Sequence, residues 1–588
     1  MGYSSTDMLT VDKVEFTKSS TLMHVTVSGR EGTTFRITPT SCLKADGKRY
    51  ALKKIPKVGI DKRLAMPKSG KVHFTMRFEP LPTDTKLMHF VEGDDDGGWH
   101  LCNIRDGKGD VTTEMTDEWK SIGYEDLEEL PESRLCDDST TIRVRILNYV
   151  PEAGRELQVI RVPFDFDQND MFQCFPIAAD GTATFTLHPC FPVTIYMRLG
   201  KGEYFPLLVT PGDECTILMD LEKGGTTPVV AFKGAFAKVN HELNVLGGKD
   251  FALFDGSAAH FDSLLARKQE MEVLLRNGLI NQLNKIQYSK YSHATKEWMV
   301  MDTEYRYTEW LSQYNKHVEK KVEQDLKAAH SSILNNMPLW NKLRRGMKER
   351  HDNGRCPLHF LQFRKMTYIP HYVEAVRFAS ITDIEAKDNV HPYNKDIWKL
   401  FLALSSNEQY AYEEGLKKAE GIADPELKAY YPVAAKRWND HVEGFNRIPH
   451  VHYDAHGGDL HGQKLKERLL EDYRGKNVAF LVYDRNDEQA LSELEEIDPI
   501  IASTNDQITV FIHIDTNFMG VRGWLQSARR WHGEHYGGRR TRYDSMFNNH
   551  GYSASGILYE LHAPDGATTL STTDKKEALA AIENLKKE

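Results

Sequence analysis

Residues 475–486 read Gly-Lys-Asn-Val-Ala-Phe-Leu-Val-Tyr-Asp-Arg-Asn, and residues 487–490, which follow them, read Asp-Glu-Gln-Ala. The apolar run at 478–482 has the length and composition of a strand that is buried on both faces. A helical pattern follows at 488–497, and Asp487 stands where an acidic side chain caps a helix. This junction predicts an α/β domain in the C-terminal part of the chain.

The remaining elements of this domain follow in a clear order. A second apolar strand is expected at 508–514, a helix at 524–531, a strand at 557–561, a turn at Pro564-Asp565-Gly566 and a helix at 575–586. With the first strand and helix they give the order β-α-β-α-β-β-α, which is that of a thioredoxin-like fold. We therefore predict that residues 448–588 form a C-terminal α/β thioredoxin-like domain.

The N-terminal half of the chain is rich in predicted strands. Residues 1–105 and 138–228 contain segments such as 72–78, in which apolar and polar residues alternate. This period of two predicts two antiparallel β-sandwich-like domains. The polar, acidic residues 106–137 between them are predicted to be a linker. From 229 to 447 the apolar residues recur at steps of three and four, which predicts an α-helical region.

Length and composition limit the functional classes. A chain of 588 residues is too long for one hydrophobic core and should be multidomain. With 40% hydrophobic residues, 27% charged residues and a net charge of −10, nothing suggests nucleic acid as a partner. No apolar run reaches the roughly 18 residues of a membrane-spanning helix. The first residues lack signal-peptide features, which leaves open a cytoplasmic protein or an export leader or lipid anchor outside this chain.

Three other segments resemble the TlpA-like family of the thioredoxin superfamily, in particular its long multidomain members from Bacteroidetes. Residues 74–82 (FTMRFEPLP) are similar to the first β-domain of those proteins, and residues 207–213 (LLVTPGD) to the end of the second. Residues 232–240 (FKGAFAKVN) are similar to the start of their helical region. The resemblance covers nearly the whole chain, and it implies a location in the periplasm or at the cell surface.

The chain departs from this family at the redox site. The family's strand G-K-V-V-L-I-D-F-W-A-T-W leads into C-G-P-C, and residues 475–486 align with that strand without a gap. The positions that match C-G-P-C are Asp487, Glu488, Gln489 and Ala490. Thiol–disulfide exchange needs a thiolate at the helix N-terminus and a second thiol one turn later, so we predict no catalytic residue here. The segment 551–559, which matches the family's cis-proline loop, contains no proline.

The cysteines elsewhere in the chain provide no substitute C-x-x-C pair. They are Cys42, Cys102, Cys136, Cys174, Cys190, Cys215 and Cys356. Most are expected to be buried, neutral thiols, and a bridge among Cys174, Cys190 and Cys215 is the alternative. An oxidoreductase role would need a thiol outside the usual site, for which Cys356 is a candidate.

Two clusters in the C-terminal domain suggest binding. His450, His452 and His456 have a spacing that could hold a metal ion, although a solvated loop is the simpler interpretation. A basic run could bind an anion, or it could be another solvated loop. Its members are Arg529, Arg530, His532, His535, Arg539, Arg540 and Arg542. No P-loop, G-x-G-x-x-G, G-x-S-x-G or H-E-x-x-H motif is present.

These observations favour a redox-inactive envelope protein that acts as a binding or interaction module. It would need no cofactor, and its partner would be another envelope protein. This hypothesis is favoured because the fold pattern is intact while the redox site lacks sulfur. The alternatives are a thiol–disulfide oxidoreductase that uses a non-standard cysteine and a metal- or anion-binding protein.

Overall fold

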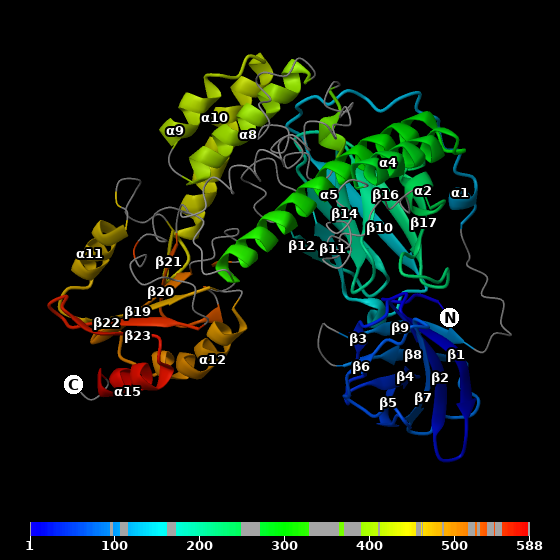
Figure 1. Ribbon diagram of the computed structural model, residues 1–588, viewed down its shortest axis with the longest axis horizontal. Helices are drawn as coiled ribbons and strands as arrows, with labels where there is room; N and C mark the ends of the chain where they lie inside the picture. Colours follow the sequence, from blue (N-terminus) through cyan, green and yellow to red (C-terminus); the bar gives the residue numbers. More distant parts are fainter. Residues whose placement is uncertain are drawn as a thin grey trace. The chain divides into compact units, whose positions relative to one another are not determined.

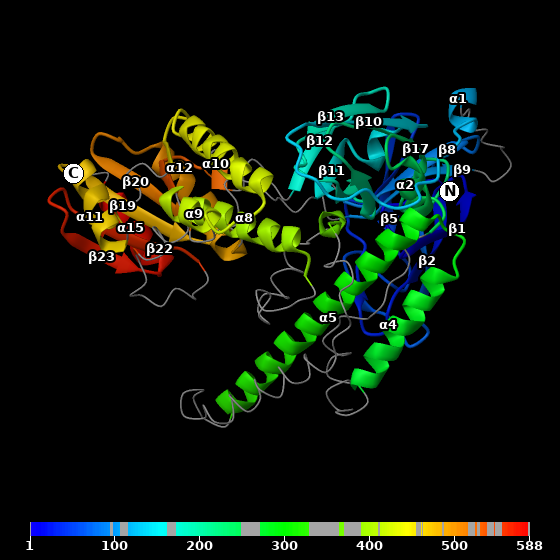
Figure 2. The ribbon, with the colours of Figure 1, turned by 90° about the horizontal axis from the view of Figure 1, so that it is seen from above.

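The structure, a computed structural model, divides the chain into two compact units (Figures 1 and 2). The first contains the described residues up to His391, and the second contains those from Pro392 onward. The residues that the structure describes are 2–93, 98–105, 116–160, 172–247, 271–328, 364–369, 390–409, 412–453, 460, 462–484, 487–515, 524–525, 528, 530–537, 546 and 556–585.

The first β-domain is built on one antiparallel sheet with the strand order β1-β2-β7-β5-β4-β8-β9. The strands are β1 (Leu9–Phe16), β2 (Thr21–Ser28), β4 (Cys42–Ala45), β5 (Lys48–Lys54), β7 (Lys71–Phe78), β8 (Leu87–Val91) and β9 (His100–Arg105). A ribbon of β3 (Thr34–Phe35) and β6 (Leu64–Ala65) adds Phe35 to the same core. The strand register shifts within β1, β5 and β8, so the pairing of this sheet is irregular at three places. The expected sandwich is therefore a seven-stranded sheet and a ribbon rather than two similar sheets.

The second β-domain contains two four-stranded sheets, β13-β10-β16-β17 and β12-β11-β14-β15. The strands are β10 (Thr140–Leu147), β11 (Glu156–Ile160), β12 (Phe172–Pro176), β13 (Thr182–Leu187), β14 (Val193–Leu199), β15 (Phe205–Val209), β16 (Glu214–Asp220) and β17 (Val229–Lys233). Ile142 and Phe185 from one sheet share a core with Leu157 and Leu207 from the other. Strands β10 and β16 are parallel, and β17 extends the domain past the predicted boundary at residue 228.

Helices of the predicted region 229–447 occur in both units. The first unit contains α2 (Ala237–Asn244), α4 (Met271–Gln287) and α5 (His293–Ala328), and the second contains α8 (Pro392–Gln409), α9 (Tyr412–Ala419) and α10 (Pro425–Phe445). Figure 2 shows α4 and α5 side by side. The buried Trp298 fixes α5 to the second β-domain, because its Nε1 donates to Thr194 Oγ1 at 2.9 Å. None of the described helices is both long and apolar enough to cross a membrane.

The shorter segments of the first unit are ordered by contacts with these domains. They include α1 (Asp117–Lys120) and the 3-10 helices η1 (Pro151–Ala153) and η6 (Met366–Tyr368). Within the predicted linker, Ser133 Oγ lies 2.6 Å from Thr367 Oγ1, and Lys365 binds both Glu129 and Glu297. This part of the linker is therefore attached to the segment that contains η6.

The second unit contains a mixed sheet with the strand order β18-β21-β20-β19-β22-β23. The strands are β18 (Val451–Tyr453), β19 (Asn477–Tyr483), β20 (Thr509–Asp515), β21 (Glu534–Gly537), β22 (Leu558–His562) and β23 (Thr568–Thr572). The first four strands in this order are mutually parallel, whereas β22 and β23 run antiparallel to their neighbours.

Helices cover both faces of this sheet (Figure 1). Helix α11 (Gly462–Asp472) packs on one face, and α12 (Glu488–Ala502) and α15 (Lys575–Leu585) pack on the other. Every residue of β19 and β20 is consequently buried, as their continuous apolar runs predict. Asp487 lies at the carboxyl end of β19, where it begins α12.

Candidate functional site

The carboxylate of Asp487 joins two segments that are far apart in the sequence. Its Oδ1 accepts a hydrogen bond from Gln489 N at 3.0 Å, which is the N-cap contact of α12. Its Oδ2 accepts another from Gly556 N at 2.6 Å, immediately before β22. Both are charge-assisted bonds to backbone N–H groups. Asp487 therefore caps α12 and also holds the backbone that leads into β22.

Glu493, one turn and a half later on α12, holds the same backbone. Its Oε2 accepts from Ile557 N and from the Tyr559 hydroxyl, each at 3.2 Å, and its Oε1 accepts from Gln489 Nε2 at 3.0 Å. Gly556 has a φ of +101°, and a Cβ there would lie 3.0 Å from Glu493 Oε1. Glycine is therefore required by both backbone conformation and space. We call Asp487, Glu493 and Gly556 the carboxylate clamp.

The positions that match C-G-P-C have separate structural roles. Asp487 is the helix cap, and Gln489 is exposed beside it. Ala490 is 0% exposed and packs in the core with Leu494 and Ile497. The side chain of Glu488 and the segment 551–555 lie outside the described residues. The described groups supply carboxylate oxygens and an amide but no nucleophilic sulfur.

Two of the three predicted metal ligands meet one carboxylate. His450 Nδ1 lies 2.9 Å from Glu534 Oε1, and His452 Nε2 lies 2.5 Å from Glu534 Oε2. The contact with His452, followed by that with His450, lowers the pKa of Glu534 to about 2, against the effect of its burial. His456 lies outside the described residues, within which no group of three suitable side chains could hold a metal ion. The observed contacts are those of one carboxylate held between two histidines.

The described members of the basic run already have partners. Arg530 binds Glu495 at 2.6 Å, and His532 Nδ1 lies 2.9 Å from Asp498 Oδ2, so carboxylates of α12 contact both. His535 is buried, and the loss of hydration lowers its pKa to about 4. Arg529, Arg539, Arg540 and Arg542 lie outside the described residues. The described part therefore forms no open cluster of positive charge.

The cysteines in the described part of the chain form no disulfide bonds with one another. They are Cys42, Cys102, Cys136, Cys174, Cys190 and Cys215. The alternative of a bridge among Cys174, Cys190 and Cys215 is therefore wrong in this structure. Burial raises the pKa of Cys102 and of Cys215, which favours unreactive thiols at these two positions. Cys356 lies outside the described residues.

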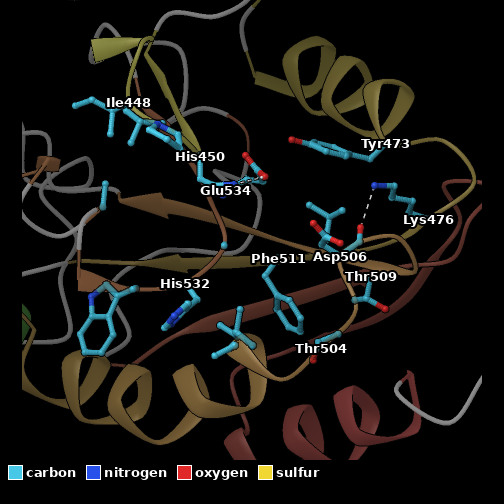
Figure 3. Close-up of a pocket in the computed structure, with 18 residues that line it drawn as sticks. Ile448, His450, Tyr473, Lys476, Thr504, Asp506, Thr509, Phe511, His532 and Glu534 are labelled. Carbon is cyan, nitrogen blue, oxygen red and sulfur yellow. Dashed lines mark hydrogen bonds and ion pairs between the residues drawn. The ribbon is translucent and has the colours of Figure 1, made fainter. Parts of the chain in front are cut away.

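A cavity of about 450 Å³ lies at the opposite end of the sheet from Asp487. It borders the amino end of β20 at Thr509 and Phe511 and the start of β21 at Glu534. Figure 3 shows Tyr473 and Lys476 at one side of it. The cavity thus lies entirely within the second unit and is separate from the carboxylate clamp.

Several of these residues are not indicated directly by any pattern in the sequence. Glu493 is the exception, because it interrupts the apolar stripe of α12 formed by Ala490, Leu494 and Ile497, and a carboxylate in such a stripe needs polar partners. Glu534 and Gly556 become significant only through contacts with residues more than 60 positions away. No local pattern identifies such contacts.

Comparisons with known proteins give little further information. The chain matches no protein family and no curated protein. Among solved structures it is similar to the pneumococcal exposed lipoprotein thioredoxin from Streptococcus pneumoniae strain TIGR4, at 13% identity. The match covers 20% of this chain and 89% of the other, with a TM-score of 0.16, which is too low to support an argument.

Proposed function

We propose that this protein is a non-catalytic, TlpA-type envelope protein whose C-terminal unit is a thioredoxin-like binding module. The carboxylate clamp is the observation that carries the proposal. In a redox-active member of this fold, a cysteine pair would occupy the positions of Asp487 and Ala490. Here one position is a carboxylate bound to two backbone N–H groups, and the other is buried in the core.

The sheet supports the thioredoxin-like part of the proposal. The parallel strands β20 and β19 are followed across the sheet by the antiparallel strands β22 and β23, and helices cover both faces. The strand β21 lies between β18 and β20 as an additional element. We infer a function in recognition, because Gln489 at the start of α12 is exposed and the described residues beside it carry no thiol.

Reduction of insulin disulfides tests the absence of redox catalysis. We expect the purified full-length protein and a variant with all seven cysteines changed to serine to give the same rate, equal to that of buffer with reductant. A faster rate for the wild type would contradict the proposal. Cys356→Ser would then show whether that thiol is responsible.

A gain of function tests the proposed correspondence with C-G-P-C. The double variant Asp487→Cys and Ala490→Cys should form an intramolecular disulfide on mild oxidation, visible as a loss of two hydrogen masses. The other cysteines should be replaced by serine in this experiment. If both new thiols remain alkylatable after oxidation, the positions do not correspond to a thioredoxin redox pair.

Site-specific photo-crosslinking tests the binding role. A benzoylphenylalanine at the exposed Gln489 should capture a partner in the native envelope fraction, whereas the same group at the exposed Lys464, on α11, should not. Capture at both positions or at neither would argue against a recognition surface at the start of α12.

A further inference from the structure

The cavity in the second unit forms where strand β20 extends beyond the start of its neighbour β21. Strand β20 begins at Thr509, but β21 pairs with it only from Ile512 onward. Among the described residues, no strand pairs with 509–511 on the side away from β19. Strands β18 and β20 both neighbour β21, so they lie about two strand spacings, roughly 9.5 Å, apart. The cavity occupies the space beyond the start of β21.

One wall of the cavity is apolar. It is formed by Ile448, Val451, Ile501, Val510, Phe511 and Trp531. Most of these side chains also belong to the buried core, so the wall is largely fixed by packing. A volume of about 450 Å³ is within the usual range for small-molecule sites. The wall therefore suits an aromatic or branched aliphatic group.

Two buried side chains of the cavity have hydrogen-bonding atoms without a partner. Trp531, 8% exposed, has no acceptor for its Nε1–H among the described residues, and the hydroxyl of Thr509, 2% exposed, has no partner there either. Buried polar atoms in proteins are normally hydrogen-bonded, and leaving them unpaired is costly. A ligand that offers acceptor oxygens would satisfy both.

Lys476 supplies a cation that no carboxylate of the described part of the chain neutralises. Its Nζ donates to the carbonyl oxygen of Asp506 at 2.9 Å, and no carboxylate of the described residues lies within ion-pair distance. The Asp506 carboxylate itself lies 3.5 Å from Gln507 Nε2. The other charged groups are paired, Glu534 with His450 and His532 with Asp498. Figure 3 shows Lys476 and Asp506 together on one side of the cavity.

We propose that this cavity binds a carboxylate that carries an aromatic or branched apolar group. The carboxylate binds Lys476, and the apolar group packs on Phe511 and its neighbours. Additional ligand oxygens accept from Trp531 and Thr509. A free organic acid and the C-terminal residue of a peptide share this chemistry. The inference does not depend on the proposed function, because the cavity and the carboxylate clamp lie at opposite ends of the parallel strands.

Calorimetric titration of the full-length protein tests the proposal with two probes. These are 3-phenylpropionate and the peptide N-acetyl-Ala-Ala-Phe with a free carboxylate, and each is compared with its neutral amide. We expect an acid to bind at least tenfold more tightly than its amide, because a hydrogen bond to a charged group is worth about tenfold or more in affinity. Binding of the peptide acid alone would identify a chain terminus as the ligand.

Variants localise the binding. Lys476→Met should weaken binding of the acid at least tenfold, and Lys464→Met, an exposed lysine on α11 outside the cavity, should leave it unchanged. Ala502→Phe, at an exposed position that lines the cavity, should block binding while the melting temperature stays close to that of the wild type. The proposal is overturned if neither acid binds at millimolar concentration, if acids and amides bind equally, or if Lys476→Met has no effect.

Discussion

Replacement of Asp487 by alanine should loosen the junction between α12 and β22. The change removes the N-cap bond to Gln489 N, worth about 1 kcal/mol. It also removes the 2.6 Å bond from Gly556 N to a charged oxygen, worth about 1.5–3 kcal/mol. Because water can reach part of this site, we expect a total loss of about 2–3 kcal/mol. Asp487→Asn keeps one acceptor oxygen and should give an intermediate loss.

Hydrogen exchange followed by mass spectrometry measures this effect locally. A peptide that contains Gly556 and Ile557 should exchange about thirty- to a hundred-and-fortyfold faster in Asp487→Ala, since each 1.4 kcal/mol corresponds to a factor of ten. Asp574→Ala is the matched control, because Asp574 caps α15 through Lys576 N and Glu577 N. It should accelerate exchange in α15 alone. Unchanged exchange at Gly556 in Asp487→Ala would refute the clamp as a stabilising contact.

Three further predictions concern stability. Burial lowers the pKa of His535 from 6.5 to about 4. Between these two pH values the unfolded state therefore binds more protons than the folded state. The second unit should lose stability as the pH falls from 6.5 to about 4. His535→Gln should flatten this dependence, and urea midpoints at pH 7 and pH 4.5 measure it. Lys466→Met should cost about 3 kcal/mol, the lower end of the range for breaking a buried pair, because the buried carboxylate of Glu560 loses its lysine but keeps His562 Nε2 at 2.7 Å; a melting temperature close to the wild-type value would contradict this. Trp298→Phe should cost about 2–3 kcal/mol of the first unit's stability in urea, because the smaller ring leaves a cavity at this buried position and the bond to Thr194 is lost.

The sequence predicts those parts of the fold that depend on short repeats of hydrophobicity. The apolar runs at 478–482 and 508–514 correspond to β19 and β20. A strand that is covered on both faces has no exposed side chains, so its sequence is continuously apolar. Alternation also predicts strands such as β7 and β10. It does not predict how strands assemble, and the first β-domain therefore differs from the expected sandwich.

In the candidate sites, too, contacts between neighbouring residues can be predicted from the sequence, and contacts between distant residues cannot. That Asp487 caps α12 could be predicted, since the cap and the helix are adjacent in the sequence. Its second bond, to Gly556, spans 69 positions and depends on the placement of β22 beside β19. The spacing of His450 and His452 predicts a cluster, but their shared partner Glu534 comes from β21, more than 80 positions later.

The sequence alone thus determined that no cysteine follows residue 356, which strand leads into α12, and that an acidic residue begins this helix. These are properties of composition and of neighbouring residues. Three further features are visible only in the folded chain: one carboxylate joins α12 to β22, two histidines converge on Glu534, and a cavity forms beyond the start of β21. Each of these depends on which strands become neighbours, and strand pairing is set by packing across the whole sheet rather than by any local pattern.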